Sequence, residues 1–175
     1  LYSFTMKFLI IFIYLITTSL SYSIEQPDIE NIVINKYPKS YKNITFKDIN
    51  NKIINLKDFE NKLIILNFWA TWCVPCLEEM PSLDSLQSKK INDLIIFPIN
   101  IGQEDLLKSK LFFKELKIKN LNIYSDPKVK LPKKFLIRGI PTTILINKEG
   151  KEFARIIGSI DFNDRKFINW LKNFN

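Results

Sequence analysis

The strongest constraint on the fold is an apolar run at residues 63–69, LIILNFW, in which only Asn67 is polar. A half-exposed strand alternates polar and apolar residues, so this run predicts a strand buried on both faces of a sheet. After Cys73 the period changes, because apolar residues recur every three or four positions and predict a helix over residues 74–89. The chain thus passes from a buried strand directly into a helix, with a cysteine at the junction.

The rest of the domain continues this alternation. We expect further strands at residues 44–46, 53–56, 94–99, 121–124, 142–146 and 152–157. We expect further helices at residues 104–116, 127–135 (opened by Asp126 as a cap) and 162–174. Pro81 should bend the first helix. Turn residues at 48–51 and 147–150 join strands into hairpins, so the pattern predicts an α/β three-layer sandwich around a mixed sheet.

The N-terminus carries a targeting pattern. Residues 8–16 are an unbroken apolar run, extended to residue 20, with Lys7 before it and small residues after it. A secretory signal has 7–15 such residues, whereas a bilayer-spanning helix needs about 20. We therefore expect residues 1–23 to be a signal peptide or an N-terminal membrane anchor. Either one places the rest outside the cytoplasm, since Lys7 stays inside.

Residues 24–42 are polar and contain two prolines. We expect them to form a tether or an edge segment that leads into a single domain at residues 43–175. That length and a hydrophobic content of 46% are enough for one core.

Composition excludes several classes of function. The net charge is +8, but the cations are mostly scattered lysines, and only Arg138, Arg155 and Arg165 are arginines. Nucleic-acid binding proteins gather Arg and aromatic residues in one patch, so we expect no nucleic-acid partner. The sequence has no histidine, which removes His-based acid–base catalysis and His-containing metal sites. We expect a monomer.

The only two cysteines, Cys73 and Cys76, carry the candidate chemistry. A separation of three in a helix puts both sulfurs on one face, close enough to bond. The N–H groups and positive dipole end of a helix N-terminus stabilise a thiolate. We therefore expect Cys73 to be the exposed nucleophile with a lowered pKa, and Cys76, one turn in, to be the buried resolving thiol. Pro75 suits the first turn, where its missing N–H costs nothing.

Three other readings of the two cysteines fit less well. A structural disulfide would close a very short loop, which restricts the unfolded chain little. A metal site would need about four ligands, and the sequence has no further Cys or His. A peroxide-reducing cysteine expects Thr or Ser three residues earlier and Pro seven residues earlier, where this chain has Ala70 and Leu66.

These residues resemble the active site of the thioredoxin superfamily. The motif FWATWCVPC at residues 68–76, followed by EMP at 79–81, is most similar to the TlpA/ResA branch of periplasmic disulfide reductases. The segment GIPT at 139–142 is similar to the cis-proline loop of that branch, and NKEG at 147–150 to the hairpin turn after it.

The resemblance implies a thioredoxin fold with an N-terminal β-hairpin. It also implies an inserted αβ element at residues 104–124, between the helix that carries the cysteines and the cis-proline loop. Pro141 would be in cis and face the two sulfurs, with Trp72, Pro75 and Ile140 supporting the substrate groove.

Two departures from the resemblance concern the proton of Cys76. Plain thioredoxins carry a buried Asp where this sequence has Asn67, and an amide cannot accept a proton. In the ResA branch a Glu after Asn-(Val/Ile)-Gly lies near the cysteines, whereas here Gln103 intervenes before Glu104. We expect Glu104 or water to handle the proton. In the alternative, Glu104 only begins a helix and complements its dipole.

Compartment and chemistry together predict an exported reductase of protein disulfides, with no cofactor besides the Cys73–Cys76 disulfide. The periplasm is kept oxidising, so a membrane thiol transporter of CcdA/DsbD type would supply electrons. The resemblance implies clients in the assembly of cytochrome c or of the cytochrome oxidase copper site. The alternatives are a thiol oxidase or isomerase, and a redox-regulated binding module without turnover.

Overall fold

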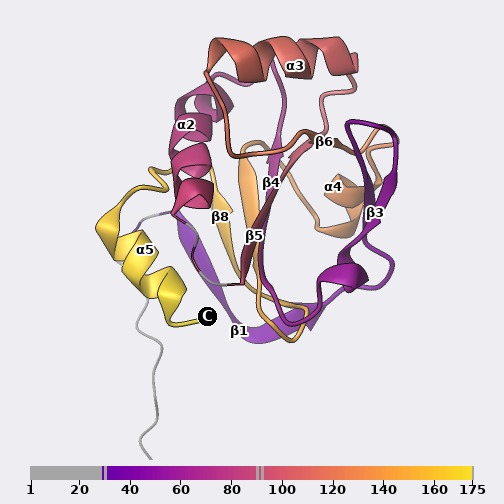
Figure 1. The fold of residues 1–175 in the computed structure, drawn as a ribbon. Coiled ribbons are helices and arrows are strands. Elements are labelled where there is room, and N and C mark those ends of the chain that lie inside the picture. The colour runs from indigo at the N-terminus through magenta and orange to yellow at the C-terminus, as the bar shows by residue number, and fades with distance from the viewer. Residues whose placement is uncertain (1–28, 30, 90, 92, 175) are drawn as a thin grey trace, which may run out of the picture.

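A computed structural model describes residues 29, 31–89, 91 and 93–174. Their strands form one mixed sheet of eight in the order β1-β8-β7-β4-β5-β6-β2-β3 (Figure 1). The strands are β1 (Ile32–Ser40), β2 (Thr45–Asp48), β3 (Ile53–Asn55), β4 (Leu63–Trp69), β5 (Leu94–Asn100), β6 (Tyr124–Ser125), β7 (Thr142–Ile146) and β8 (Lys151–Ile157). The helices are the 3-10 helix η1 (Leu56–Phe59), α2 (Val74–Ser88), α3 (Leu106–Glu115), α4 (Lys130–Lys134) and α5 (Arg165–Lys172).

Strand β4 lies near the middle of this sheet, parallel to β5 and antiparallel to β7, and all seven of its residues are buried. Its side chains alternate between two cores. Leu63, Ile65 and Trp69 join the cluster formed with α2, α3 and α5. The even-numbered residues join the cluster formed with α4 and the β2–β3 hairpin. Figure 1 shows α2 and α5 on one side of the sheet and α4 on the other. The expected three layers and mixed sheet are confirmed.

The expected tether needs correction. Residues 32–40 form the edge strand β1, which pairs antiparallel with β8, and Ile32 is buried. The domain therefore begins well before residue 43, and the edge-segment reading is right. The residue pattern did not predict this strand, because an edge strand exposes most of its side chains, here including Lys36, Tyr37 and Lys39.

The predicted signal or anchor at residues 1–23 lies outside the described residues. Among the residues that the structure does describe, no helix has both the length and the apolar character needed to span a membrane.

Smaller differences concern where elements begin and end. The strand expected at 121–124 is only β6, and α4, α3 and α5 are shorter than the predicted helices. Asp126 does not cap α4 at its first residue, but its carboxylate accepts the N–H of Leu131 at 2.7 Å. Asp105 and Asp164 cap α3 and α5 by accepting N–H groups two or three residues further on. Pro81 lies inside α2 without ending it.

A buried carboxylate fastens β1 to the sheet. Glu152 is fully buried, and Arg155 donates to it from Nε at 2.7 Å and from Nη2 at 3.0 Å. Tyr41, just after β1, donates its hydroxyl to the same carboxylate at 2.5 Å, and Asn35 donates at 3.1 Å. Burial alone would raise the pKa of Glu152, but these hydrogen bonds outweigh it, and the pKa lies below its ordinary value. Burial and the neighbouring Glu152 raise the pKa of Tyr41 to about 12, so the phenol remains a donor at neutral pH.

We predict that Tyr41→Phe lowers the free energy of unfolding by about 1.5–3 kcal/mol, the usual contribution of a hydrogen bond to a charged group. The ring contact with Phe135, at 4.4 Å between centroids, remains possible in the variant. Urea unfolding of the domain measures the change. Tyr37→Phe is the matched control, because Tyr37 is 77% exposed and should tolerate the loss of its hydroxyl. Equal effects of the two substitutions would contradict this account of β1.

Candidate active site

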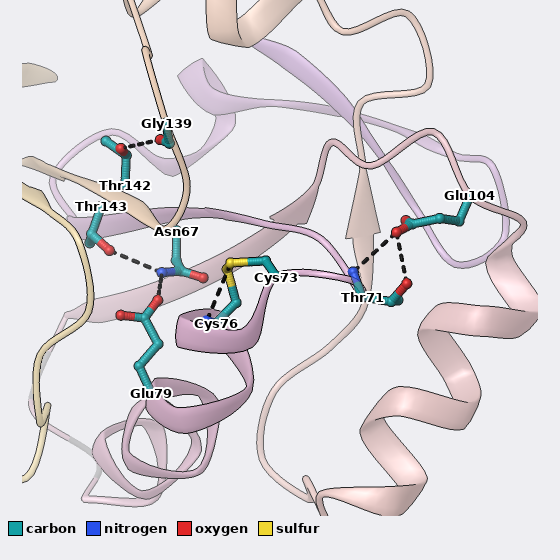
Figure 2. The surroundings of a disulfide bond; sticks show 9 residues. All are labelled: Asn67, Thr71, Cys73, Cys76, Glu79, Glu104, Gly139, Thr142 and Thr143. Carbon is teal, nitrogen blue, oxygen red and sulfur yellow. Dashed lines mark hydrogen bonds between the residues drawn. A yellow bond between two sulfur atoms is a disulfide. The ribbon is translucent and has the colours of Figure 1, made fainter.

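The two cysteines lie where β4 passes into α2. Cys73 is the N-cap of α2 and Cys76 lies in its first turn, with 5.3 Å between their Cα atoms. Their sulfurs form a disulfide (Figure 2). Cys73 is 4% exposed and Cys76 is 0% exposed. As expected, Cys76 is more buried than Cys73. The expectation of an exposed Cys73 is wrong for this oxidised form, because both cysteines belong to the core cluster beneath α2.

The helix start acts directly on Cys73. The backbone N–H of Cys76 donates to Cys73 Sγ at 3.3 Å, as a side chain at an N-cap position allows. The same contact and the helix dipole would stabilise a thiolate on Cys73 after reduction. Pro75 occupies the first turn, where no N–H is needed. Trp72 and Val74 flank Cys73 and are 66% and 63% exposed.

The cis-proline loop meets this junction at the same edge of the sheet. The Ile140–Pro141 peptide bond is cis. Thr142 pairs with Phe68 across β7 and β4, so Pro141 lies beside the end of β4, from which the chain leads to Cys73. The hydroxyl of Thr142 donates to the carbonyl of Gly139 at 2.7 Å and closes the loop (Figure 2). Ile140 is half-buried and packs against both hydrophobic clusters.

A buried polar cluster lies beneath the cysteines. One of its members, Glu79, was not predicted as a site residue from the sequence. Asn67 of β4 donates its amide to Glu79 Oε1 at 2.7 Å and to Thr143 Oγ1 at 3.0 Å (Figure 2). All three residues are buried. Glu79 lies three residues after Cys76 on α2, which places the two side chains on neighbouring positions of one helix face. That spacing, with a carboxylate among apolar helix residues, was the signal that could have identified Glu79.

Burial raises the pKa of Glu79 to about 7, although the hydrogen bond from Asn67 and the nearby backbone of Ile160 favour the charged form. Its second oxygen, Oε2, has no side-chain or backbone hydrogen bond from the described residues. None of the salt bridges among the described residues involves Glu79. A carboxyl group with a pKa near 7 can exchange a proton near neutral pH, and Glu79 lies three residues from Cys76 on the same helix.

Glu104 occupies a different position from either expectation. Its Oε1 accepts the N–H of Thr71 at 3.1 Å and the Thr71 hydroxyl at 2.7 Å (Figure 2). Helix α3 begins later, at Leu106, and takes Asp105 as its cap. A Cβ atom at Gly102 would meet the Glu104 carboxylate, which would have to shift away from its present position. Glu104 thus ties the segment after β5 to the loop that precedes Cys73.

In the part of the chain that the structure covers, no cluster of three or more His, Cys, Asp or Glu side chains is arranged to hold a metal ion.

We predict that Glu79 makes stability depend on pH. Its pKa is raised from 4.5 to about 7, so its contribution is fully present below pH 4.5 and is lost as the pH rises through 7. The oxidised wild-type domain should lose about 3 kcal/mol across this range relative to Glu79→Gln, from the size of the shift. Urea unfolding between pH 4.5 and 8 measures the difference. Glu78→Gln, at the exposed neighbouring position, should follow the wild type, and a Glu79→Gln curve parallel to both would refute the raised pKa.

Comparison with known proteins agrees with this geometry. A sequence model of the AhpC/TSA family matches residues 38–151, more than half of the chain. The thiol-disulfide oxidoreductase ResA of Bacillus cereus is 34% identical over 121 residues, which cover 69% of each chain.

Solved structures show the same fold. A DsbF homologue from Corynebacterium diphtheriae superposes with a TM-score of 0.69 at 19% identity, covering 85% of this chain and 96% of its own. The exposed lipoprotein thioredoxin of Streptococcus pneumoniae superposes with a TM-score of 0.64 at 27% identity, covering 75% of this chain and 98% of its own. With its two cysteines at the start of α2, the chain belongs to the thioredoxin-like AhpC/TSA family and is a thiol-disulfide oxidoreductase of the ResA type.

Proposed function

We propose that the chain works as an exported reductase of protein disulfides, with Cys73 as the attacking thiol and Cys76 as the resolving thiol. The observation that carries this proposal is the asymmetry between the two sulfurs. Cys73 Sγ receives a helix N–H, whereas Cys76 is fully buried one turn from a carboxyl group whose pKa is about 7. The first environment favours a thiolate and the second favours removal of a proton.

The reaction then has two exchange steps. The Cys73 thiolate attacks one sulfur of the client disulfide, and the client's other sulfur leaves as a thiolate. Cys76 gives its proton to the Glu79 carboxylate and attacks Cys73 Sγ, which releases the second client thiolate and leaves the Cys73–Cys76 disulfide. Two electrons pass from the enzyme dithiol to the client, and a dithiol donor must later return them.

Asn67 has a supporting role in this scheme. Its amide donates to Glu79 Oε1 and so holds the carboxyl group in place, but it takes up no proton itself. Glu79 therefore replaces Glu104 and water as the proposed acceptor of the Cys76 proton. Glu104 instead shapes the loop before Cys73 through its two hydrogen bonds to Thr71.

The surroundings of Cys76 favour the reducing direction. A strongly oxidising enzyme of this chemistry needs its reduced form stabilised, usually through its thiolate. Here a buried carboxyl group lies next to the pair, and when it ionises it disfavours a second negative charge nearby. The dithiol gains less from ionisation than in an oxidant, so it gives up its electrons more readily.

Compartment and partners are part of the proposal. The apolar run after Lys7 would export the domain, as a cleaved signal or as a retained anchor, and the pneumococcal relative is itself an exposed lipoprotein. Electrons would come from a membrane thiol transporter of CcdA/DsbD type. The clients would be apocytochrome c or proteins that assemble the copper site of cytochrome oxidase.

We expect the reduction potential of the Cys73–Cys76 pair to lie near that of thioredoxin, about −270 mV. Equilibration of the domain (residues 29–175) with dithiothreitol buffers, followed by alkylation and mass analysis, measures it. A potential near that of DsbA, about −120 mV, would reject the reductase and favour the thiol oxidase.

We also expect the two single cysteine variants to behave differently with a protein disulfide. Cys76→Ser should accumulate a mixed disulfide between Cys73 and insulin, because a hydroxyl cannot resolve it and the fast intramolecular exit is lost. Cys73→Ser should form few adducts, since Cys76 is fully buried. Non-reducing gels detect the adducts, which should vanish on reduction. Equal yields from both variants would exclude the asymmetric mechanism.

A further inference from the structure

The α4 side of the sheet carries a group of lysines that have no ion-pair partner among the described residues. They come from β2, from the turn before α4 and from α4 itself, and we call them the α4 patch: Lys47, Lys128, Lys130, Lys133 and Lys134. None of the salt bridges in the described part of the chain involves any of them. By contrast, Lys62 and Lys148 both pair with Asp93.

Contacts and helix geometry bring these lysines onto one surface. Lys47, Lys128 and Lys130 line one cavity of about 190 Å³ between β2 and the segment that leads into α4. Lys130, Lys133 and Lys134 are three and four residues apart in α4, so their side chains lie on neighbouring positions of the helix. The lysines of α4 and the two beside the cavity therefore form one positive surface.

Little negative charge offsets this surface. From residue 127 to residue 148 the chain has six Lys or Arg residues and no Asp or Glu. Asp126 lines the cavity, but it is buried and its carboxylate accepts the N–H of Leu131 at 2.7 Å. Lys134 donates to the backbone carbonyls of Lys42 and Asn43, which carry no net charge. The α4 patch thus attracts anions.

Two large apolar side chains are exposed beside the α4 patch. Ile53 of β3 pairs with Lys47, lines the same cavity and is 66% exposed. Leu136, two residues after α4, is 73% exposed. Lysines around exposed apolar side chains suit the surface of an anionic bilayer, where apolar groups enter the headgroup region and ammonium groups contact lipid phosphates.

Binding at this surface leaves the redox site free. Figure 1 shows α4 on one side of the sheet and α2 on the other. Cys73 and Cys76 belong to the cluster beneath α2, whereas Leu131 and Phe135 at α4 belong to the other cluster. A bilayer that covers the α4 patch therefore leaves the side with α2 uncovered.

We propose that the α4 patch, with Leu136 and Ile53, docks the domain on an anionic lipid bilayer. The apolar run after Lys7 would bring the domain to a membrane, and a basic patch is the usual second signal that strengthens such an association. Docking would hold the enzyme beside its membrane electron donor. The inference uses the export that the proposed function includes, but vesicle binding requires neither cysteine, so the two can fail separately.

Vesicle sedimentation tests the docking. The domain of residues 29–175, which contains the eight-stranded sheet and both hydrophobic clusters, is mixed with vesicles at low ionic strength. One set of vesicles holds equal parts of phosphatidylglycerol and phosphatidylcholine, and the other holds phosphatidylcholine alone. The partition coefficient should be at least about tenfold larger for the anionic vesicles, and about 0.5 M salt should remove the difference by screening.

A matched pair of charge variants locates the binding surface. The triple variant Lys128→Gln, Lys130→Gln and Lys133→Gln should partition about tenfold or more weakly into anionic vesicles, because each lysine near the surface contributes. The control replaces three exposed lysines of α3 and removes the same net charge: Lys108→Gln, Lys110→Gln and Lys114→Gln. It should change the partition coefficient about twofold or less, since α3 would not touch the bilayer.

A second pair of variants tests the apolar contact. Leu136 has a φ of 55°, a left-handed conformation that Asn tolerates, so Leu136→Asn should keep the fold. It should weaken partition into anionic vesicles about fivefold, from the loss of partial burial of the leucine side chain. Leu111→Asn, at an exposed position of α3, is the control and should partition as the wild type does. Circular dichroism checks that every variant is folded.

The outcomes separate docking from the proposed function. Equal partition of the wild-type domain into both kinds of vesicle, or into neither, overturns the docking. So does an α3 triple variant that binds as weakly as the α4 triple variant, because net charge alone would then explain the binding. Calorimetric titration that finds binding to polyglutamate, with none to anionic vesicles, would assign the patch to an acidic polypeptide instead. Insulin reduction, measured without vesicles, tests the proposed function independently.

Discussion

The central constraint is the position of β4 between β5 and β7. Because side chains of a strand alternate, one pairing register sends Trp69 toward α2 and α3 and Phe68 toward α4. The same register turns Asn67 toward α2, where it meets Glu79, and sets Thr142 beside the end of the strand. A slip by one residue would exchange the two cores and place Asn67 on the wrong face. Core packing and redox site therefore depend on a single alignment.

Two buried glutamates show how surroundings divide structural from chemical roles. Glu152 is held by the Arg155 guanidinium and the Tyr41 hydroxyl, so it stays charged and fastens an edge strand. Glu79 has only an amide donor from a side chain, and burial brings its pKa to about 7. A compensated charge suits a permanent contact, whereas an uncompensated carboxyl group can exchange a proton. Only the second lies beside the disulfide.

Much of the fold was predictable because its signals are local. The apolar run of β4 and the change of period after Cys73 needed only residues a few positions apart. The failures have physical reasons too. Strand β1 is stabilised by pairing with β8 more than a hundred residues away, and its exposed side chains carry no strand pattern. Short elements such as β6 and α4 depend on their partners, here β2, β5 and Asp126.

The sequence by itself determined the chemistry, since two cysteines three apart at a helix start permit thiol exchange wherever that helix lies. Only the tertiary structure decided which groups serve that chemistry. The pKa of Glu79 is raised by burial, and the groups that contact its carboxyl are Asn67 of β4 and the backbone of Ile160, neither of which belongs to its own helix. Glu104 accepts its hydrogen bonds from Thr71, which is 33 residues away in the sequence. Burial and hydrogen-bond partners arise from long-range packing, so local sequence patterns do not contain them.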